Sequence, residues 1–198
     1  MSGPPRLGPP PWARSQGEVL TIKDDAHGFG YWLERPYVSA ELREQLVQAN
    51  VLIVPVERFR QHEGPLFTTG TEELFHFLRA QSPGGVVVDI CIEDNDYQEY
   101  SLHDATIEIA HLVIGSLVLP LVVHVLWRFI EKRLTKGRGT VKAELTVVEP
   151  DGQASTLRYD GPAEEFNQAL QKLGSGERPR PPALPSKPRS KKESRRRR

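Results

Sequence analysis

The sequence predicts an α+β protein with a small N-terminal α/β domain, one transmembrane helix, a C-terminal ββα module and disordered termini. A run of 19 residues, 109–127, contains no Asp, Glu, Lys or Arg. Segments with strand and helix periodicity alternate before this run, and a strand, turn, strand and helix pattern follows it. The predicted boundaries are 1–17 and 174–198 for the termini, 18–104 for the α/β domain, 109–130 for the transmembrane helix and 140–173 for the module.

The two ends of the chain explain much of its low hydrophobic share of 38%. Residues 1–17 are rich in Pro and Gly, and residues 174–198 contain little except Pro, Ser, Lys and Arg. Such segments bury too little apolar surface to offset the entropy of ordering them, so both are predicted to be disordered. Residues 1–108 carry 8 basic and 17 acidic side chains, although the formal net charge of the whole chain is zero. The later part is therefore basic, which is typical of segments that contact anionic lipid or nucleic acid.

The apolar run IAHLVIGSLVLPLVVHVLW is predicted to cross a membrane as a helix. At about 1.5 Å per residue, a helix of this length spans roughly 28 Å, which matches the hydrocarbon core of a bilayer. Trp127 suits the membrane interface, and the basic residues that follow it place the C-terminal side in the cytoplasm by the positive-inside rule. The predicted localisation is a membrane, crossed once, with a cytoplasmic C-terminus. The alternative is a buried core helix, which should show one polar stripe.

Residues 18–104 alternate between strand and helix patterns. Strands are predicted at residues 18–23, 50–56 and 85–93. Ser39 can cap a first helix, and Thr69 with Glu72 forms a capping box for a second. The order β, α, β, α, β favours a small α/β domain, whose sheet order does not follow from the sequence.

Residues 140–173 predict a β-hairpin followed by an amphipathic helix. The turn Pro150-Asp151-Gly152 joins two alternating strands, and Phe166 and Leu170 fall on one apolar stripe of the helix. A unit of this size rarely folds alone, so it is predicted to need a partner surface. The candidate protein-binding residues are Pro150, Asp151 and Gly152 on the turn, and Phe166 and Leu170 on the helix.

Polar side chains inside or beside the predicted membrane helix are further candidates, because such groups are costly in a bilayer. They are Glu108, His111 and His124. Glu108 and His111 are three residues apart and share a helix face, where oligomerisation could line a pore with them. His111 and His124 lie about 220° apart around a helix axis, so one helix cannot direct both to one metal ion. The open alternatives are proton or ion movement and ordinary polar contacts between helices.

The chain contains no recognisable catalytic or cofactor motif. Cys91 lies mid-strand between two isoleucines, without the surroundings that activate a thiol, and is predicted to be inert. The acidic cluster at residues 93–96 lacks the glycine and the terminal glutamate of a calcium loop. Phosphate-binding, nucleophile-elbow and paired Cys/His metal motifs are missing from the sequence. We therefore expect a protein that is not an enzyme and that binds no cofactor and no metal.

The stretches HLVIGSLVLPLVVHVLWRFIEKRL and VKAELTVVEPDGQASTLRYDGPAEEFNQALQKL combine a kinked apolar helix, a basic stop, a hairpin and an amphipathic helix. In this combination, residues 105–173 resemble the effector-associated constant component family of bacterial conflict systems. The resemblance implies a non-enzymatic, membrane-associated component that works beside a separately encoded effector, such as a protease or nuclease, in defence or signalling. It implies no catalytic residues.

We therefore expect a single-pass, membrane-anchored adaptor that recruits an effector in a bacterial defence or signalling system. Its module and tail would contact a protein partner or a second copy of the chain, with anionic lipid along the basic tail. One alternative is an oligomeric pore-former built on the membrane helix. Another is a soluble nucleic-acid-binding protein that uses the tail, which is disfavoured because no aromatic residue is interleaved with the basic ones.

Overall fold

The computed structural model describes residues 20–24, 26–57, 62, 64–100, 106–134 and 138–176. The disorder predicted for residues 1–17 lies outside these ranges, and so does the predicted basic tail beyond Gly176. Contacts of that tail with lipid or nucleic acid therefore stay predictions.

Helices and strands alternate along most of the described chain. The strands are β1 (Leu20–Asp24), β2 (Val51–Val54), β3 (Phe67–Thr68), β4 (Val88–Ile90), β5 (Glu99–Tyr100), β6 (Ile107–Glu108), β7 (His111–Gly115), β8 (Thr140–Val148) and β9 (Ala154–Pro162). The helices are α1 (Phe29–Leu33), α2 (Ala40–Leu46), α3 (Thr71–Gln81), α4 (Leu119–Arg133) and α5 (Ala163–Gly174), with a 3-10 turn at Asp94–Asp96. This alternation is the signature of a mixed α/β fold.

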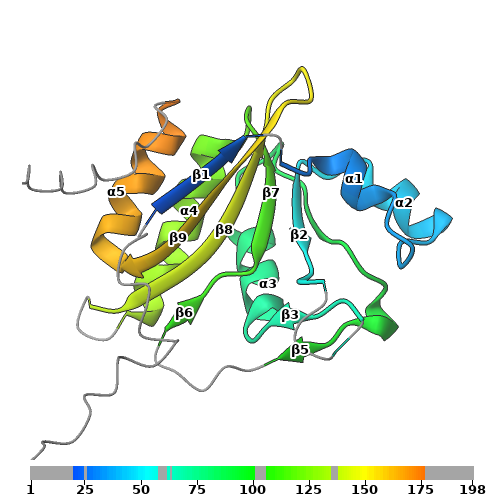
Figure 1. Cartoon of the computed structure of the whole chain (residues 1–198), viewed down its shortest axis with the longest axis horizontal. Coiled ribbons are helices and arrows are strands. Elements are labelled where there is room, and N and C mark those ends of the chain that lie inside the picture. The colour runs from blue at the N-terminus through cyan, green and yellow to red at the C-terminus, as the bar shows by residue number, and fades with distance from the viewer. Residues whose placement is uncertain are drawn as a thin grey trace, which may run out of the picture.

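Within the described residues, seven strands form one mixed sheet along the path β1-β9-β8-β7-β2-β4, with β6 paired to the start of β8 (Figure 1). β7 and β8 are parallel, as are β2 and β4, whereas the pairs β1/β9, β8/β9 and β2/β7 are antiparallel. β3 and β5 form a separate two-stranded sheet. The predicted fold class, with an α/β domain, a membrane helix and a separate module, is therefore wrong, because β8 pairs with β7 and β9 pairs with β1.

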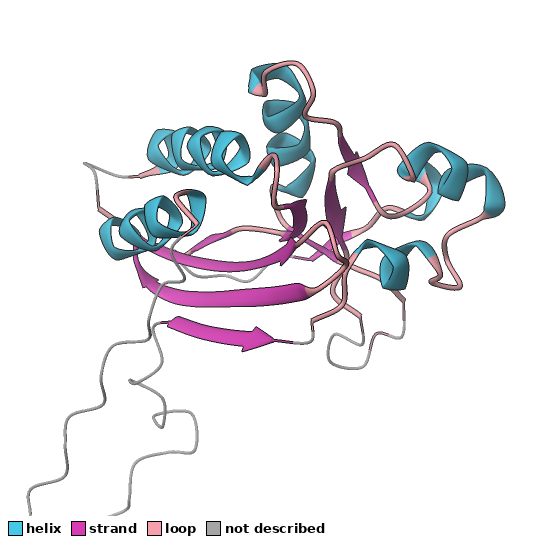
Figure 2. Cartoon of the chain, turned by 90° about the horizontal axis from the view of Figure 1, so that it is seen from above, coloured by secondary structure: helices cyan, strands magenta, loops and turns pink. Residues whose placement is uncertain are grey.

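The two faces of the sheet are covered differently (Figure 2). Helices α3, α4 and α5 cover one face from β4 to β9. Helices α1 and α2 lie against the opposite face, where they pack on β2 and β7. In β2, Val51 and Ile53 face α3 and α4, whereas Leu52 and Val54 face α1 and α2. In the described part of the chain, no helix covers this second face over β8, β9 and β1.

The predicted transmembrane helix is wrong. None of the helices in the described ranges combines the length and the apolarity needed to cross a membrane. The apolar run divides between β7, buried at the centre of the sheet, and the first part of α4. A strand buried on both faces is apolar at most positions, so its sequence merges with that of the following helix into one uncharged run. α4 has 15 residues, and at 1.5 Å per residue it is only about 22 Å long.

α4 also carries the polar stripe of a helix that packs on a sheet. His124, Arg128 and Glu131 are exposed at spacings of four and three residues, whereas Leu126 and Phe129 between them are buried. In the sequence, this polar stripe can be recognised only if the helix is placed at residues 119–133. The predicted range 109–127 excludes Arg128 and Glu131. The prediction of a single-pass membrane protein with a cytoplasmic C-terminus is therefore wrong. The alternative of a pore also loses the membrane helix on which it was built.

The elements predicted for the C-terminal region are confirmed. β8 and β9 form the expected hairpin, and Gly152 in its turn has a φ of 86°, which favours glycine. α5 follows directly, with Phe166 and Leu170 on its buried stripe. Pro162 is the last residue of β9 and occupies the N-cap position of α5.

The predicted N-terminal elements are also present. β2 and β4 lie within their predicted strands, and β1 overlaps the predicted strand 18–23 but ends one residue later, at Asp24. The Ser39 hydroxyl caps α2 by accepting from the amide of Leu42 at 3.0 Å. The capping box at Thr69 is wrong, because the amides of Gly70 and Glu72 at the start of α3 donate to the Glu99 carboxylate. Because the carboxylate that caps α3 comes from Glu99 of β5, the residues around the start of α3 do not reveal the cap in the sequence.

Candidate functional site

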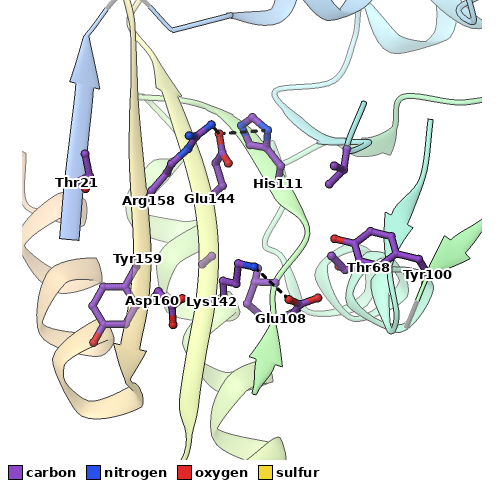
Figure 3. Close-up of a pocket in the computed structure, with 13 residues that line it drawn as sticks. Thr21, Thr68, Tyr100, Glu108, His111, Lys142, Glu144, Arg158, Tyr159 and Asp160 are labelled. Carbon is purple, nitrogen blue, oxygen red and sulfur yellow. Dashed lines mark hydrogen bonds and ion pairs between the residues drawn. The ribbon is translucent and has the colours of Figure 1, made fainter. Parts of the chain in front are cut away.

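The uncovered face of β8 and β9 is charged because residues alternate between the two faces of a strand. Lys142 and Glu144 of β8, and Arg158 and Asp160 of β9, lie on this face (Figure 3). Their neighbours in the strands are buried on the helix side: Val141, Ala143, Leu145, Leu157 and Tyr159. The hairpin therefore presents an apolar face to the helices and a charged face outward.

A cavity of about 450 Å³ lies over this charged face. β6 and β7 border it on one side, and Thr68 of β3 and Tyr100 of β5 lie across from the hairpin (Figure 3). A second cavity of about 370 Å³ adjoins it and is bordered by β1 and by Tyr31 and Trp32 of α1. The two cavities share Val56, His111, Glu144 and Arg158. We call the combined hollow the sheet trough; its size is typical of ligand sites.

His111 of β7 lies at the junction of the two cavities. Its Nε2 is 2.8 Å from Thr146 Oγ1, which is 2.6 Å from Thr156 Oγ1, so a hydrogen-bonded chain runs beneath the trough from β7 to β9. The Trp32 indole packs edge-on against the imidazole, with ring centroids 5.7 Å apart. Burial lowers the pKa of His111 to about 4, although the Glu144 carboxylate, 3.9 Å from Nδ1, opposes this shift. His111 is therefore neutral at neutral pH.

The charges in the trough are only partly compensated. Within the described residues, three trough carboxylates pair with Lys or Arg: Glu144 with Arg158 at 2.8 Å, Glu108 with Lys142 at 3.5 Å and Glu57 with Arg35 at 2.7 Å. Among the described residues, the side chains of Lys23 and Asp160 form neither an ion pair nor a hydrogen bond. Lys23 lines the second cavity and Asp160 the first, so the two cavities contain uncompensated charges of opposite sign.

α1 forms an aromatic wall beside the second cavity. His27 stacks on Tyr31 with ring centroids 3.6 Å apart, and the Arg35 guanidinium lies 4.8 Å from the Tyr31 centroid. Trp32 is only 6% exposed, and its indole Nε1 has no hydrogen-bond partner in the described structure. A buried N–H without an acceptor costs about 1–3 kcal/mol. Trp32 therefore carries a buried indole N–H without a partner among the described residues.

The buried hydroxyl and thiol groups near the trough are not activated. The hydroxyls of Thr146 and Thr156 are buried and engaged in the chain below the trough. Cys91 is fully buried, and burial raises its pKa to about 12, so it stays a neutral thiol at neutral pH. No group of three metal-ligating side chains occurs in the ranges that the structure describes. The trough offers hydrogen-bond donors, acceptors and charges, but none of its described lining residues is an activated nucleophile.

Two of the predicted site residues do lie together, for a different reason from the one predicted. Glu108 and His111 come from β6 and β7, and both line the trough instead of one face of a membrane helix. His124 is exposed on α4, which covers the other face of the sheet. Their predicted placement on a membrane helix is therefore wrong.

The predicted protein-binding residues divide into two groups. Pro150, Asp151 and Gly152 form the exposed turn of the hairpin, and their role in protein binding stays a prediction. Phe166 and Leu170 are 0% exposed, because α5 packs them against the sheet. Their side chains contact the core of this chain and are not available as a surface.

The sequence-based prediction missed the residues that make the trough. Lys142, Glu144 and Arg158 occupy the polar positions of the hairpin, so their alternation did mark one face as polar. The sequence did not show that no helix covers that face, because the positions of α1 and α2 depend on tertiary packing. Trp32 carried no local signal at all.

No family model, curated protein or solved structure matches this chain. The resemblance of residues 105–173 to effector-associated components therefore stays a prediction.

Proposed function

We propose that the chain is a non-enzymatic interaction protein whose sheet trough binds an extended segment of a partner protein. The observation that carries this proposal is the one-sided cover of the sheet. α1 and α2 protect one face of β2 and β7, whereas the same face of β8 and β9 is hollowed and charged. Such a face is accessible to a partner without any rearrangement of the core.

The shape of the trough supports an extended ligand. Its two cavities are continuous and open to solvent, and on β8 their lining positions run from Lys142 to Thr146. The four residue steps from Lys142 to Thr146 cover about 13 Å of strand. The trough therefore matches about four residues of an extended peptide.

The charges in the trough support a peptide over a polyanion such as nucleic acid. The described lining residues include five carboxylates and three Lys or Arg side chains. The carboxylates are Asp24, Glu57, Glu108, Glu144 and Asp160, and the cations are Lys23, Lys142 and Arg158. A polyanion needs an excess of cations, whereas a peptide brings donors, acceptors and charges of both signs.

The resemblance of residues 105–173 to effector-associated components supports an effector enzyme as the partner. In this function the chain would bind a segment of the effector and bring it to its site of action, without contributing catalytic groups.

The experiment that tests the proposal is a selection of peptides from a random display library on the full chain, followed by affinity measurements on variants. Peptides selected on the wild type should lose at least about tenfold in affinity with Arg158→Glu or Lys142→Glu, which reverse charges in the trough. The matched control is Asp151→Lys, which reverses a charge on the exposed hairpin turn and should leave the affinity unchanged.

Two results would contradict the proposal. If Asp151→Lys abolishes binding and the trough variants do not, the hairpin turn is the docking surface. If no peptide is enriched above background, the trough does not bind peptides. Urea unfolding of each variant separates a loss of binding from a loss of fold.

A further inference from the structure

We propose that a groove beside α3, separate from the sheet trough, binds the basic tail of the same molecule, residues 177–198. The groove has a volume of about 740 Å³ and is bordered by α2, α3, the end of β4 and the 3-10 turn. We call it the α3 groove. It shares no lining residue with either cavity of the trough, so this inference does not depend on the proposed function. Three features support it: a partly aromatic lining, an excess of carboxylates, and a tail of complementary composition that can reach it.

The lining of the α3 groove includes buried apolar side chains and two aromatic rings. Leu42 of α2 and Ile92 after β4 are buried. Phe75 of α3 and Tyr97 after the 3-10 turn are partly exposed. The Arg79 guanidinium already lies over Phe75, 5.1 Å from the ring centroid. Aromatic-lined grooves bind Pro-rich segments, and aromatic rings also attract guanidinium groups.

The charged lining of the α3 groove is predominantly acidic. Arg79 is the one Lys or Arg side chain among its described lining residues. Its carboxylates are Glu72, Asp89, Glu93 and Asp94. Within the described ranges, none of these four pairs with a Lys or Arg side chain, in contrast to three carboxylates of the trough. The α3 groove therefore has an excess of negative charge, which favours a basic ligand.

The tail beyond Gly176 has the complementary composition. It contains ten Lys or Arg residues, two Glu and five Pro. Its Pro residues suit an aromatic-lined groove, and its cations suit unpaired carboxylates. A segment joined to the chain is also present at an effective concentration on the order of millimolar, which favours it over a free segment of similar composition. Docking in the α3 groove withholds these charges from the anionic lipid or nucleic acid predicted as contacts of the tail.

The tail is long enough to reach the α3 groove. The described chain ends at Gly176, directly after α5, and α4 contacts both α5 and α3. Packed helices lie about 8–10 Å apart, so the axis of α3 is roughly 20 Å from that of α5. Phe77 of α3 packs on Phe129 of α4, whereas the groove residues lie on another face of α3. The path to that face is roughly 30 Å, and 22 extended residues span up to roughly 75 Å.

The test attaches a nitroxide spin label to the tail of the ¹⁵N-labelled full chain and measures which amide signals lose intensity. Ser194→Cys provides the attachment site. Cys91 is fully buried and its pKa is raised to about 12, so it does not react with the label in the folded protein. We expect the signals of Asp94 and Tyr97 in the α3 groove to lose intensity relative to the same sample after chemical reduction of the label. The signal of Arg158 in the trough should keep its intensity.

Charge reversal in the α3 groove tests what holds the tail. The double variant Glu72→Lys/Asp94→Lys should restore the intensity of the Tyr97 signal, because it replaces two carboxylates with cations that repel the tail. The matched control is Glu149→Lys/Asp151→Lys, which makes the same change of charge on the exposed hairpin turn and should leave the loss of intensity unchanged. In 1 M salt, where the screening length falls to about 3 Å, the wild-type loss should disappear without any substitution. Urea unfolding shows whether each variant keeps its fold.

A mixed sample distinguishes the tail of the same molecule from that of a second copy. It combines spin-labelled ¹⁴N chain with ¹⁵N chain that has no spin label. The groove signals should keep their intensity in this mixture, because each groove is occupied by its own tail. If they lose as much intensity as in the spin-labelled ¹⁵N chain, the tail binds a second copy, and docking within one molecule is wrong.

Two further results would contradict the proposal. If the groove and trough signals lose intensity equally, the tail has no preferred site on the chain. If the loss at the groove survives both the charge reversal and 1 M salt, the groove carboxylates do not hold the tail. The proposed function of the trough is unaffected by either result, because its test uses different residues and a different ligand.

Discussion

The sheet has two halves that differ in how many of their faces are covered. At β2 and β7, Leu52 and Val113 are buried under α1 and α2, while Ile53 and Ile114 are buried under the helices of the other face. At β8 and β9 only one face is covered, and the side chains of Lys142 and Arg158 on the other face are 55% and 54% exposed. Of the strands in the half covered twice, only His111 of β7 lines the trough, whereas β8 and β9 supply its charged face. One continuous sheet thus combines a region devoted to stability with a region available for binding.

The largest expected effect comes from the region covered twice. Leu52→Ala removes a fully buried side chain between β2 and α1–α2, and should lower the free energy of unfolding by about 2–5 kcal/mol. Asp160→Ala, an exposed residue on the same face of the sheet in the other half, should change it by no more than about 0.5 kcal/mol. Urea unfolding followed by circular dichroism measures both. Similar losses in the two variants would show that the halves do not differ in stability.

The same difference in coverage explains why a transmembrane helix was wrongly predicted at residues 109–127. β7 is covered on both faces, so Leu112, Val113 and Ile114 are all apolar, and the strand lacks the alternation that identifies β8 and β9. The chain then turns at Gly115 without a charged residue and enters α4. Periodicity alone cannot divide such a run into a strand and a helix.

Secondary structure was predicted better from the sequence in elements with one face open to solvent. The hairpin of β8 and β9 and the stripe of α5 were predicted with nearly correct boundaries, because their periods of two and 3.6 residues are visible locally. The candidate site was predicted only in part. Glu108 and His111 were selected for their polarity within an apolar context, and they do line the trough, but their partners Lys142 and Thr146 come from a strand more than 30 positions later. Contacts of that kind depend on the order of strands in the sheet.

The next effect is a pH dependence at the boundary between the two halves. The pKa of His111 is about 4 in the folded chain and 6.5 when unfolded, so between these values only the unfolded chain binds the proton. The contribution of His111 to stability is therefore complete above pH 6.5 and is lost as the pH falls to about 4, by on the order of 3 kcal/mol. His111→Gln removes this titration, and the difference between wild-type and variant unfolding free energies should shrink across that range. Parallel pH profiles for the two proteins would contradict the assignment.

A smaller effect is expected in the hydrogen-bonded chain that links the halves. Thr146→Val removes the hydroxyl that contacts both His111 and Thr156, and should cost about 1–3 kcal/mol because two buried polar groups lose a partner. Thr156→Val removes only the end of the chain and should cost less. Urea unfolding at pH 7.5, where His111 is neutral, gives both values. Equal costs would mean that the three side chains do not act as a connected chain.

The smallest effect on stability is expected from the ion pairs of the half covered once. Arg158→Gln breaks the pair with Glu144, and because the Arg158 side chain is 54% exposed, the cost should be below about 1 kcal/mol. In 1 M salt, where the screening length falls to about 3 Å, the difference from the wild type should nearly disappear. Urea unfolding at low and high salt measures it, and a loss above about 2 kcal/mol that persists in salt would show that this face also holds the fold together. If the loss is small, the charges of the trough contribute little to folding, and a large loss of peptide affinity in Arg158→Glu then arises from binding itself.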